Sequence, residues 1–307
     1  MGPRILVPVA ALAVFIGALI LFKGMQNTGI EFSGETAFRH VEKIVGFGER
    51  TPGSEGAEKT RQYLEAELQR LGWTTKRQVI NSDTPRGDLE YINLRARFQN
   101  DEWSNGGGMV LLCSHYDTKI YDDFEFLGAN DGGSSTGALV ELARGFAERP
   151  EIASKIELVF FDGEEAIKPN ITATDGLYGS REYAKLWRGA PPERKPVAGF
   201  LLDMIGEKNV KIEVPNDSPR HLLALVYRSA EKLGYRDRFG IRNSLILDDH
   251  VPLNNAGIPT IDLIDLDYDV WHTAGDTMDQ ISAESLEIVG STVADAIVQF
   301  LAARADD

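Results

Sequence analysis

The stretch IELVFFDGEEA, residues 156–166, joins a largely apolar run to a group of acidic side chains. An apolar run of this length indicates a strand that is covered on both faces of a sheet. The run leads to Glu164 and Glu165, two neighbouring carboxylates that repel each other unless a cation lies close to them. The pattern therefore predicts either a solvated turn or two glutamates with different tasks.

The same succession of an apolar run and a helical pattern recurs on both sides of this stretch. We expect further strands at residues 91–98, 108–114, 197–204 and 258–264, and helices at residues 34–47, 54–72, 135–148, 177–187, 218–234 and 282–305. Continuous apolar strands that alternate with helices are typical of a parallel sheet. The predicted fold class is α/β, with a mixed, largely parallel central sheet and helices on both faces.

Polar side chains gather just after the predicted strands. The segments are HYD (115–117), DGEE (162–165), DM (203–204) and WHT (271–273). In open α/β sheets, ligands bind at the edge formed by the carboxyl ends of the strands. We therefore expect the functional site at this edge.

Composition excludes several other classes of protein. The net charge of -15 over 307 residues argues against a nucleic-acid binder, which needs a basic face. The single cysteine, Cys113, excludes an intramolecular disulfide, and its apolar neighbours predict a buried core residue.

The N-terminus carries an uncharged apolar segment, residues 5–22, flanked by Arg4 and Lys23. Its length is near the lower limit for crossing a bilayer, and no clear A-x-A cleavage pattern follows it. We favour a membrane anchor over a cleaved secretory signal, with the rest of the chain outside the cytoplasm. The predicted organisation is an anchor or signal at 1–23, a linker at 24–34 and one catalytic domain at 35–307.

Five side chains at the predicted ligand edge form a candidate metal site. They supply two imidazoles and three carboxylates, which are ligands that divalent metals bind, and they are His115, Asp131, Glu165, Asp203 and His272. Each has an ordinary alternative, such as a buried histidine, a turn residue or a helix cap. Their joint occurrence favours the metal. It also gives the pair Glu164 and Glu165 two tasks, because a metal would bind one carboxylate and leave the other facing the substrate as a general base or proton shuttle.

The chain resembles the co-catalytic zinc aminopeptidase superfamily and, within it, the zinc-dependent glutaminyl-peptide cyclotransferases. The resemblance runs from about residue 35 to the C-terminus and rests on SHYDTK (114–119), GANDGGSSTGALVELAR (128–144), FFDGEEA (160–166), LYGSREYA (177–184), LLDMIG (201–206), DDHVPLNNAGIPTIDLI (248–264) and VWHTAGDTMD (270–279). It implies one or two Zn²⁺ ions as cofactors and peptide or protein N-termini as substrates.

The resemblance also implies individual roles. Asp131, Glu165 and His272 are expected to bind a zinc ion that both branches use. His115 and Asp203 match the ligands of a second metal in the aminopeptidases. Glu164 matches the general acid/base, and Asp117 is expected to orient the His115 ring.

The two branches of the superfamily carry out different reactions. An aminopeptidase hydrolyses the first peptide bond, whereas a cyclase converts N-terminal glutamine to pyroglutamate and releases ammonia. In a cyclase, Asp203 and Asp248 join a hydrogen-bond network at the substrate, and Trp271 forms a wall of the glutamine pocket. The double aspartate at 248–249 and the tryptophan before His272 favour the cyclase.

Two departures favour the aminopeptidase. Cyclases usually carry a tryptophan shortly after the glutamate pair, where this chain has Asn170 nearby, and they often carry a histidine where this chain has Asp262. The GDTMDQIS segment (275–282) also resembles an aminopeptidase ending. The cyclase is our preferred interpretation, and the aminopeptidase is the alternative. An inactive, membrane-tethered binding domain is a third interpretation, and the presence of all five ligand positions argues against it.

Overall fold

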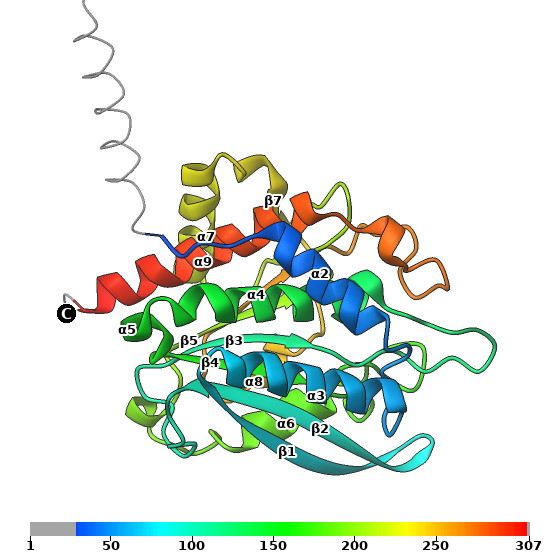
Figure 1. Ribbon diagram of the computed structural model, residues 1–307. Coiled ribbons are helices and arrows are strands. Elements are labelled where there is room, and N and C mark those ends of the chain that lie inside the picture. The colour runs from blue at the N-terminus through cyan, green and yellow to red at the C-terminus, as the bar shows by residue number, and fades with distance from the viewer. Residues whose placement is uncertain (1–28, 306–307) are drawn as a thin grey trace, which may run out of the picture.

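The computed structural model describes residues 29–305 (Figure 1). Its centre is a six-stranded sheet in the order β1-β2-β4-β3-β5-β8. The strands are β1 (Trp73–Thr84), β2 (Gly87–Phe98), β3 (Val110–His115), β4 (Ile156–Phe161), β5 (Ala198–Asp203) and β8 (Thr260–Ile264). Strands β4, β3, β5 and β8 are parallel, whereas β1 and β2 form an antiparallel hairpin whose β2 pairs with β4. The sheet is mixed and largely parallel, as predicted.

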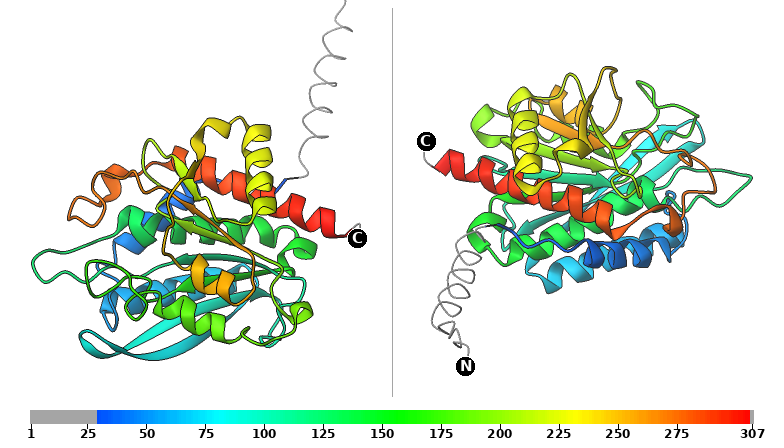
Figure 2. Two further views of the ribbon diagram at one scale, coloured as in Figure 1. Left: turned by 180° about the vertical axis from the view of Figure 1, so that it is seen from behind. Right: turned by 90° about the horizontal axis from the view of Figure 1, so that it is seen from above.

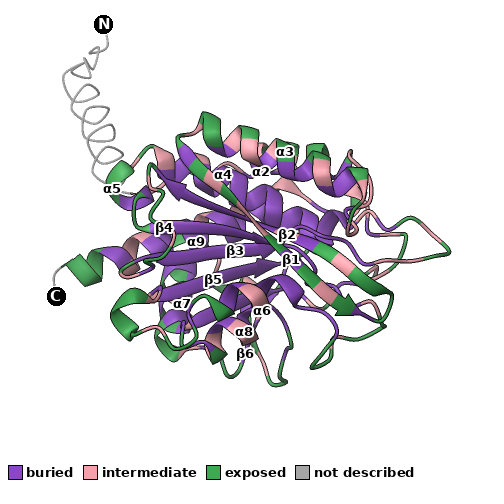
Figure 3. Ribbon diagram, turned by 90° about the horizontal axis from the view of Figure 1, so that it is seen from below, coloured by how far each residue is buried: buried purple, intermediate pink, exposed green. Residues whose placement is uncertain are grey.

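Alternate residues of the central strands enter two different cores. Leu112, Leu158 and Phe200 belong to the larger core, whereas Leu111 and Val159 belong to the smaller core on the opposite face. All six residues of β3, β4 and β5 are buried, which explains why these segments are largely apolar (Figure 3).

Helices cover both faces of the sheet, as predicted. The larger core is covered by α2 (Gly34–Val45), α3 (Glu55–Arg70), α4 (Ser135–Ala147), α7 (Arg220–Leu233) and α9 (Ala283–Ala305). The smaller core is covered by α6 (Tyr178–Lys185) and α8 (His250–Asn255). Figure 2 shows α9 lying across the same side of the molecule as α2 and α4.

Serine caps fix the beginnings of the first two described helices. The Ser33 hydroxyl accepts a hydrogen bond from the Thr36 N–H at the start of α2. The Ser54 hydroxyl accepts one from the Ala57 N–H at the start of α3. Each serine side chain thus satisfies an N–H group that the helix leaves free.

Several short elements were not predicted. They are β1, the small parallel pair β6 (Ile212–Pro215) and β7 (Phe239–Arg242), α5 (Pro150–Ala153), α8, and the short helical turns η1 (Ala129–Ser134), η2 (Pro192–Arg194), η3 (Arg236–Arg238) and η4 (Met278–Gln280). Strand β1 is an edge strand, and most of its residues are exposed or half-buried. It therefore lacks the apolar run by which the central strands were recognised.

Within residues 29–305, α9 is long and apolar enough to cross a membrane, but 61% of its most apolar window is buried inside the protein. It packs against α2 and α7 and is a core helix. The predicted anchor or signal at residues 1–23 lies outside the described residues. The described end of the predicted linker packs against the domain, since Phe32 is buried and the Ser33 N–H donates to the Glu141 carboxylate. The domain boundaries remain a prediction.

Candidate active site and metal centre

The parallel strands bring the predicted site residues to one edge of the sheet. His115 is the last residue of β3 and Asp203 is the last residue of β5. Glu164 and Glu165 follow β4, and His272 lies in the loop after β8. The carboxyl ends of β3, β4, β5 and β8 share this edge because the four strands run in the same direction. The structure therefore brings the predicted site residues together at this edge.

Asp131, Glu165 and His272 converge on one point. Each offers one donor atom, and the three donors lie within 4.8 Å of one another. His272 Nε2 lies 3.1 Å from Glu165 Oε1 and 3.4 Å from Asp131 Oδ2. His272 has a backbone φ of 57°, a left-handed conformation that is uncommon for a residue other than glycine and that occurs at functional sites.

His115, Asp131 and Asp203 form a second donor group that shares Asp131 with the first. His115 Nε2 lies 3.1 Å from Asp203 Oδ1 and 3.3 Å from Asp131 Oδ1. The neighbouring Gly132 makes this approach possible. A Cβ atom at this position would lie 2.9 Å from His115 Cε1 and 2.8 Å from the Asp117 carbonyl oxygen, and the residue has a φ of 73°.

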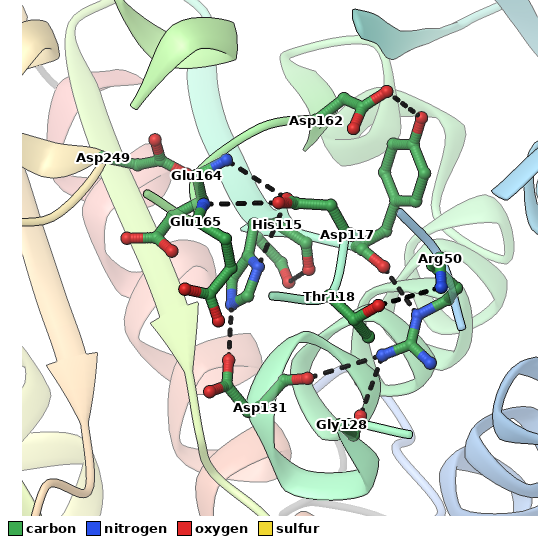
Figure 4. A network of polar contacts seen from close by, with 12 residues as sticks. Arg50, His115, Asp117, Thr118, Gly128, Asp131, Asp162, Glu164, Glu165 and Asp249 are labelled. Carbon is green, nitrogen blue, oxygen red and sulfur yellow. Dashed lines mark hydrogen bonds and ion pairs between the residues drawn. The ribbon is translucent and has the colours of Figure 1, made fainter. Parts of the chain in front are cut away.

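Asp117 links the histidine to the glutamate pair (Figure 4). One of its carboxylate oxygens accepts the Glu164 N–H at 3.2 Å, and the other accepts the Glu165 N–H at 3.2 Å. The first oxygen also lies 3.4 Å from His115 Nδ1. Asp117 therefore holds the turn that carries both glutamates and orients the His115 ring, as its predicted role requires.

Glu164 points into a cavity of about 420 Å³. Asp131, Glu165, Asp203, Asp248, Trp271 and His272 also line this cavity. The turn before the glutamates needs Gly163, whose φ is 69° and whose missing Cβ leaves room for the Tyr91 ring. The two glutamates thus reach the same cavity. Glu165 contacts His272, whereas Glu164 belongs to none of the metal-donor groups among the described residues.

The buried charges perturb one another strongly. Burial raises the pKa of Glu164 well above its usual value, and the neighbouring Glu165 and Asp248 carboxylates raise it further. Burial alone would lower the pKa of His272, but hydrogen bonds to Asp131 and Glu165 outweigh it and raise this pKa to about 10. Burial also tends to lower the pKa of His115. The carboxylates of Asp203, Asp117 and Asp131 outweigh this effect and raise the pKa well above its usual value.

The donor sets fit a divalent cation of the zinc type. Asp131 Oδ2 is buried and has no hydrogen-bond partner among the described residues. A buried polar atom without a partner is costly, and a cation held between carboxylates and imidazoles would satisfy such atoms. Two carboxylates and one imidazole in the first group leave a coordination position free, which is typical of a catalytic zinc site.

Asp248, His250 and Asp262 form a third buried group, with donor atoms within 4.8 Å of one another. His250 Nδ1 lies 3.3 Å from Asp262 Oδ2. The sequence comparison predicted that Asp248 joins a hydrogen-bond network at the substrate. It also marked Asp262 as a position where cyclases often carry a histidine. It did not indicate that His250 would lie beside Asp262, because these residues come from α8 and β8 and meet only through the fold.

Trp271 and two leucines form an apolar rim around the cavity. The Trp271 ring stacks on His272 with ring centroids 4.1 Å apart and an interplanar angle of 25°. Trp271 is 44% exposed, Leu247 is 45% exposed and Leu245 is 76% exposed. Asn170 also lines the cavity, at the point where a tryptophan was expected. This side of the rim therefore carries an amide in place of the expected aromatic ring.

Two buried cations at the site were not recognised in the sequence. Arg50 is fully buried and donates to the carbonyl oxygens of Tyr116, Leu127 and Gly128, at 2.6, 2.6 and 2.8 Å (Figure 4). Lys119 is 4% exposed and lies beside Glu165. The available signal was the position of Arg50 in the GERTPG segment and of Lys119 two residues after Asp117 in SHYDTK.

Comparison with known proteins identifies the family. Residues 93–297 match the model of peptidase family M28. The chain belongs to peptidase family M28. Among curated proteins, this M28 chain is 27% identical to the glutaminyl-peptide cyclotransferase of Dictyostelium discoideum, over 87% of this chain and 86% of that protein.

Solved structures of the M28 type agree with this assignment. A glutaminyl cyclase from an Acidobacteriales bacterium is 32% identical, with a TM-score of 0.80, covering 91% of this chain and 98% of that one. A Zn-dependent exopeptidase from Parabacteroides distasonis is 30% identical, with a TM-score of 0.78, covering 87% and 98%. The M28 assignment and these relatives confirm the predicted resemblance and fold, and they indicate a zinc-dependent enzyme.

Proposed function

We propose that this protein is a zinc-dependent glutaminyl-peptide cyclotransferase that converts N-terminal glutamine to pyroglutamate and releases ammonia. The observation that carries the proposal is the division of the glutamate pair within one cavity. Glu165 belongs to the donor group with Asp131 and His272, whereas Glu164 faces the same cavity outside that group. Relatives named glutaminyl-peptide cyclotransferases and glutaminyl cyclases support the choice of this reaction over hydrolysis.

The metal is proposed to bind through Asp131, Glu165 and His272. Bound zinc would supply Lewis-acid polarisation of the substrate's γ-carbonyl group. A single zinc ion is sufficient for this chemistry. His115 and Asp203 form the second donor group and would hold a second ion in a two-metal enzyme, while with one ion Asp203 accepts a hydrogen bond in the substrate network.

Glu164 is proposed to move the proton. The substrate's α-amine nitrogen forms a bond to the γ-carbonyl carbon, and the bond from that carbon to the amide nitrogen breaks. Glu164 accepts a proton from the amine and delivers it to the departing nitrogen, which leaves as ammonia. A carboxyl group whose pKa is raised by burial suits this task, because a general acid/base must both accept and release a proton. No water is consumed, since the attacking amine belongs to the substrate.

The remaining cavity residues are proposed to bind the substrate. Asp248 and Asp203 line the cavity, and their carboxylates would accept hydrogen bonds from the N–H groups of the substrate's α-amine. Trp271 forms one wall, where its exposed ring face meets the glutamine side chain. Asp117 acts through its hydrogen bonds to the glutamate turn.

Location outside the cytoplasm is also a proposal. It rests on the apolar segment at residues 5–22, which would tether the catalytic domain to a membrane. Cell fractionation tests it, since removal of residues 1–23 should then move the protein from the membrane to the soluble fraction.

A comparison of two substrates tests the proposed reaction. One preparation of the protein receives a glutaminyl peptide and, separately, a leucyl amide. Pyroglutamyl product and ammonia from the first, without leucine from the second, is the expected result. Release of leucine without cyclisation would instead identify an aminopeptidase, and neither activity in a zinc-loaded preparation would favour the binding-domain interpretation.

A further inference from the structure

Lys119 is a buried cation directly beside the candidate metal centre. Its ammonium group donates to the Ala166 carbonyl oxygen at 2.7 Å, to the Lys168 carbonyl oxygen at 3.1 Å and to Glu165 Oε2 at 3.3 Å. Lysine is almost never fully buried unless it is paired, and here three acceptors occupy its three donor positions. This arrangement ties the loop after β3 to the segment that follows Glu165.

The two oxygens of Glu165 have different partners. Oε1 lies 3.1 Å from His272 Nε2, on the side of the donor group. Oε2 lies 3.3 Å from Lys119 Nζ, on the opposite side. A carboxylate whose second oxygen is engaged by an ammonium group has a single oxygen available for a cation.

We propose that Lys119 is a positioning residue that reserves Glu165 Oε1 for zinc and prevents Glu165 from binding the metal through both oxygens. The inference rests on the proposed function, because it takes Glu165 as a zinc ligand. A one-oxygen glutamate leaves more of the coordination sphere open for the substrate carbonyl. Lys119 also offsets part of the negative charge that Glu165 and Asp131 bring into the buried site.

The chain after Glu165 is held from a second side as well. The Asp175 carboxylate accepts the Ile167 N–H and the Lys168 N–H, both at 2.9 Å, and the Tyr178 hydroxyl at 2.9 Å. The backbone of this segment therefore keeps its anchor on Asp175 when Lys119 is replaced. For this reason, substitution of Lys119 is expected to change the orientation of the Glu165 carboxylate more than it changes the fold.

The experiment compares full-length wild type with Lys119→Met and with the matched control Lys168→Met, whose lysine side chain is exposed. Each protein is stripped of metal, and its zinc affinity is measured by competition with a chelator. Each is then loaded with Co²⁺, whose visible absorption intensity falls as the coordination number rises. Circular dichroism and thermal melting report the fold. If Lys119→Met does not fold, Lys119→Gln, which keeps amide donors for the two carbonyl oxygens, takes its place.

We expect Lys119→Met to bind zinc about 10-fold more tightly, because loss of the ammonium group removes a cation beside the ligand carboxylate and frees its second oxygen. Its cobalt spectrum should weaken as Glu165 turns its second oxygen to the metal, while Lys168→Met should match wild type. A folded Lys119 variant with wild-type zinc affinity and a wild-type cobalt spectrum overturns the inference. This holds even if the variant melts at a lower temperature than wild type. A wild-type protein that binds neither metal overturns the proposed zinc chemistry, and this inference with it.

Discussion

His272 Nε2 lies 3.1 Å from Glu165 Oε1, although 107 residues separate the two in the chain. The contact joins the loop after β8 to the turn after β4, and β3 and β5 lie between these strands in the sheet. It places the imidazole and one carboxylate oxygen at the same candidate metal position. The contact also distinguishes Glu165 from Glu164. The two residues are consecutive in the chain, but they have different roles in the proposed reaction.

Replacement of Glu164 by glutamine should abolish turnover without loss of zinc. The amide keeps the size of the side chain but accepts no proton, so kcat should fall at least about 100-fold, which is the lower end of the contribution of a general acid/base. Steady-state kinetics and elemental analysis of the same preparation check both parts. The exposed Glu231→Gln serves as the control. Parallel loss of zinc and activity would contradict the division of tasks between the two glutamates.

Replacement of Asp117 by asparagine should weaken catalysis indirectly. The Asp117 carboxylate accepts two backbone N–H groups, and the amide of asparagine turns a donor toward one of them. The glutamate turn should then shift, and kcat/KM should fall about 10- to 100-fold. Kinetics together with a thermal melt measure the effect. An Asp117→Asn protein with full activity would show that the turn does not depend on this carboxylate.

Replacement of Trp271 by alanine should act mainly on substrate binding. The ring forms a wall of the cavity, and an aromatic contact contributes about 1 kcal/mol, which corresponds to about fivefold in KM. Trp271→Phe should retain most of the binding because a ring remains on His272. Steady-state kinetics on a glutaminyl peptide distinguish the variants. Unchanged KM in Trp271→Ala would remove this residue from the substrate pocket.

Glu207 predicts a pH dependence of stability that is separate from the active site. Burial and the nearby Asp265 carboxylate raise the pKa of Glu207 to about 7. The folded protein therefore holds this proton over a range in which the unfolded chain has released it. Stability should fall as pH rises from about 4.5 to about 7, because ionised Glu207 repels Asp265.

Glu207→Gln should remove this part of the pH dependence. Because the side chain is half-buried, we expect a difference of only about 1 kcal/mol at pH 8 after allowance for solvent screening. Urea unfolding of wild type, Glu207→Gln and the exposed control Glu231→Gln at several pH values measures it. Parallel pH curves for wild type and Glu207→Gln would refute the prediction.

The central sheet and the site edge were predictable because their physical causes are local. Strands β3, β4 and β5 are buried on both faces, so burial left an apolar run in each segment. His115 and Asp203 stand at the ends of such runs, and this position alone predicts that they lie at the ligand edge.

Contacts that depend on the assembled fold were not predictable. Strand β1 is polar because one of its faces meets solvent, so no apolar run marks it. Lys119 resembles a surface lysine until the segment after Glu165 folds over it. Arg50 likewise finds its carbonyl partners 66 to 78 residues further along the chain. The approach of His250 to Asp262 arises only from the packing of α8 on β8.

The most direct test of the central claim follows a glutaminyl peptide in water enriched in ¹⁸O by mass spectrometry. The account predicts a product that is lighter than the substrate by one ammonia and carries no ¹⁸O, because the substrate's own amine attacks the γ-carbonyl and Glu164 moves the proton. A product that has gained one ¹⁸O atom, with release of the first residue, would contradict the account and identify a hydrolase.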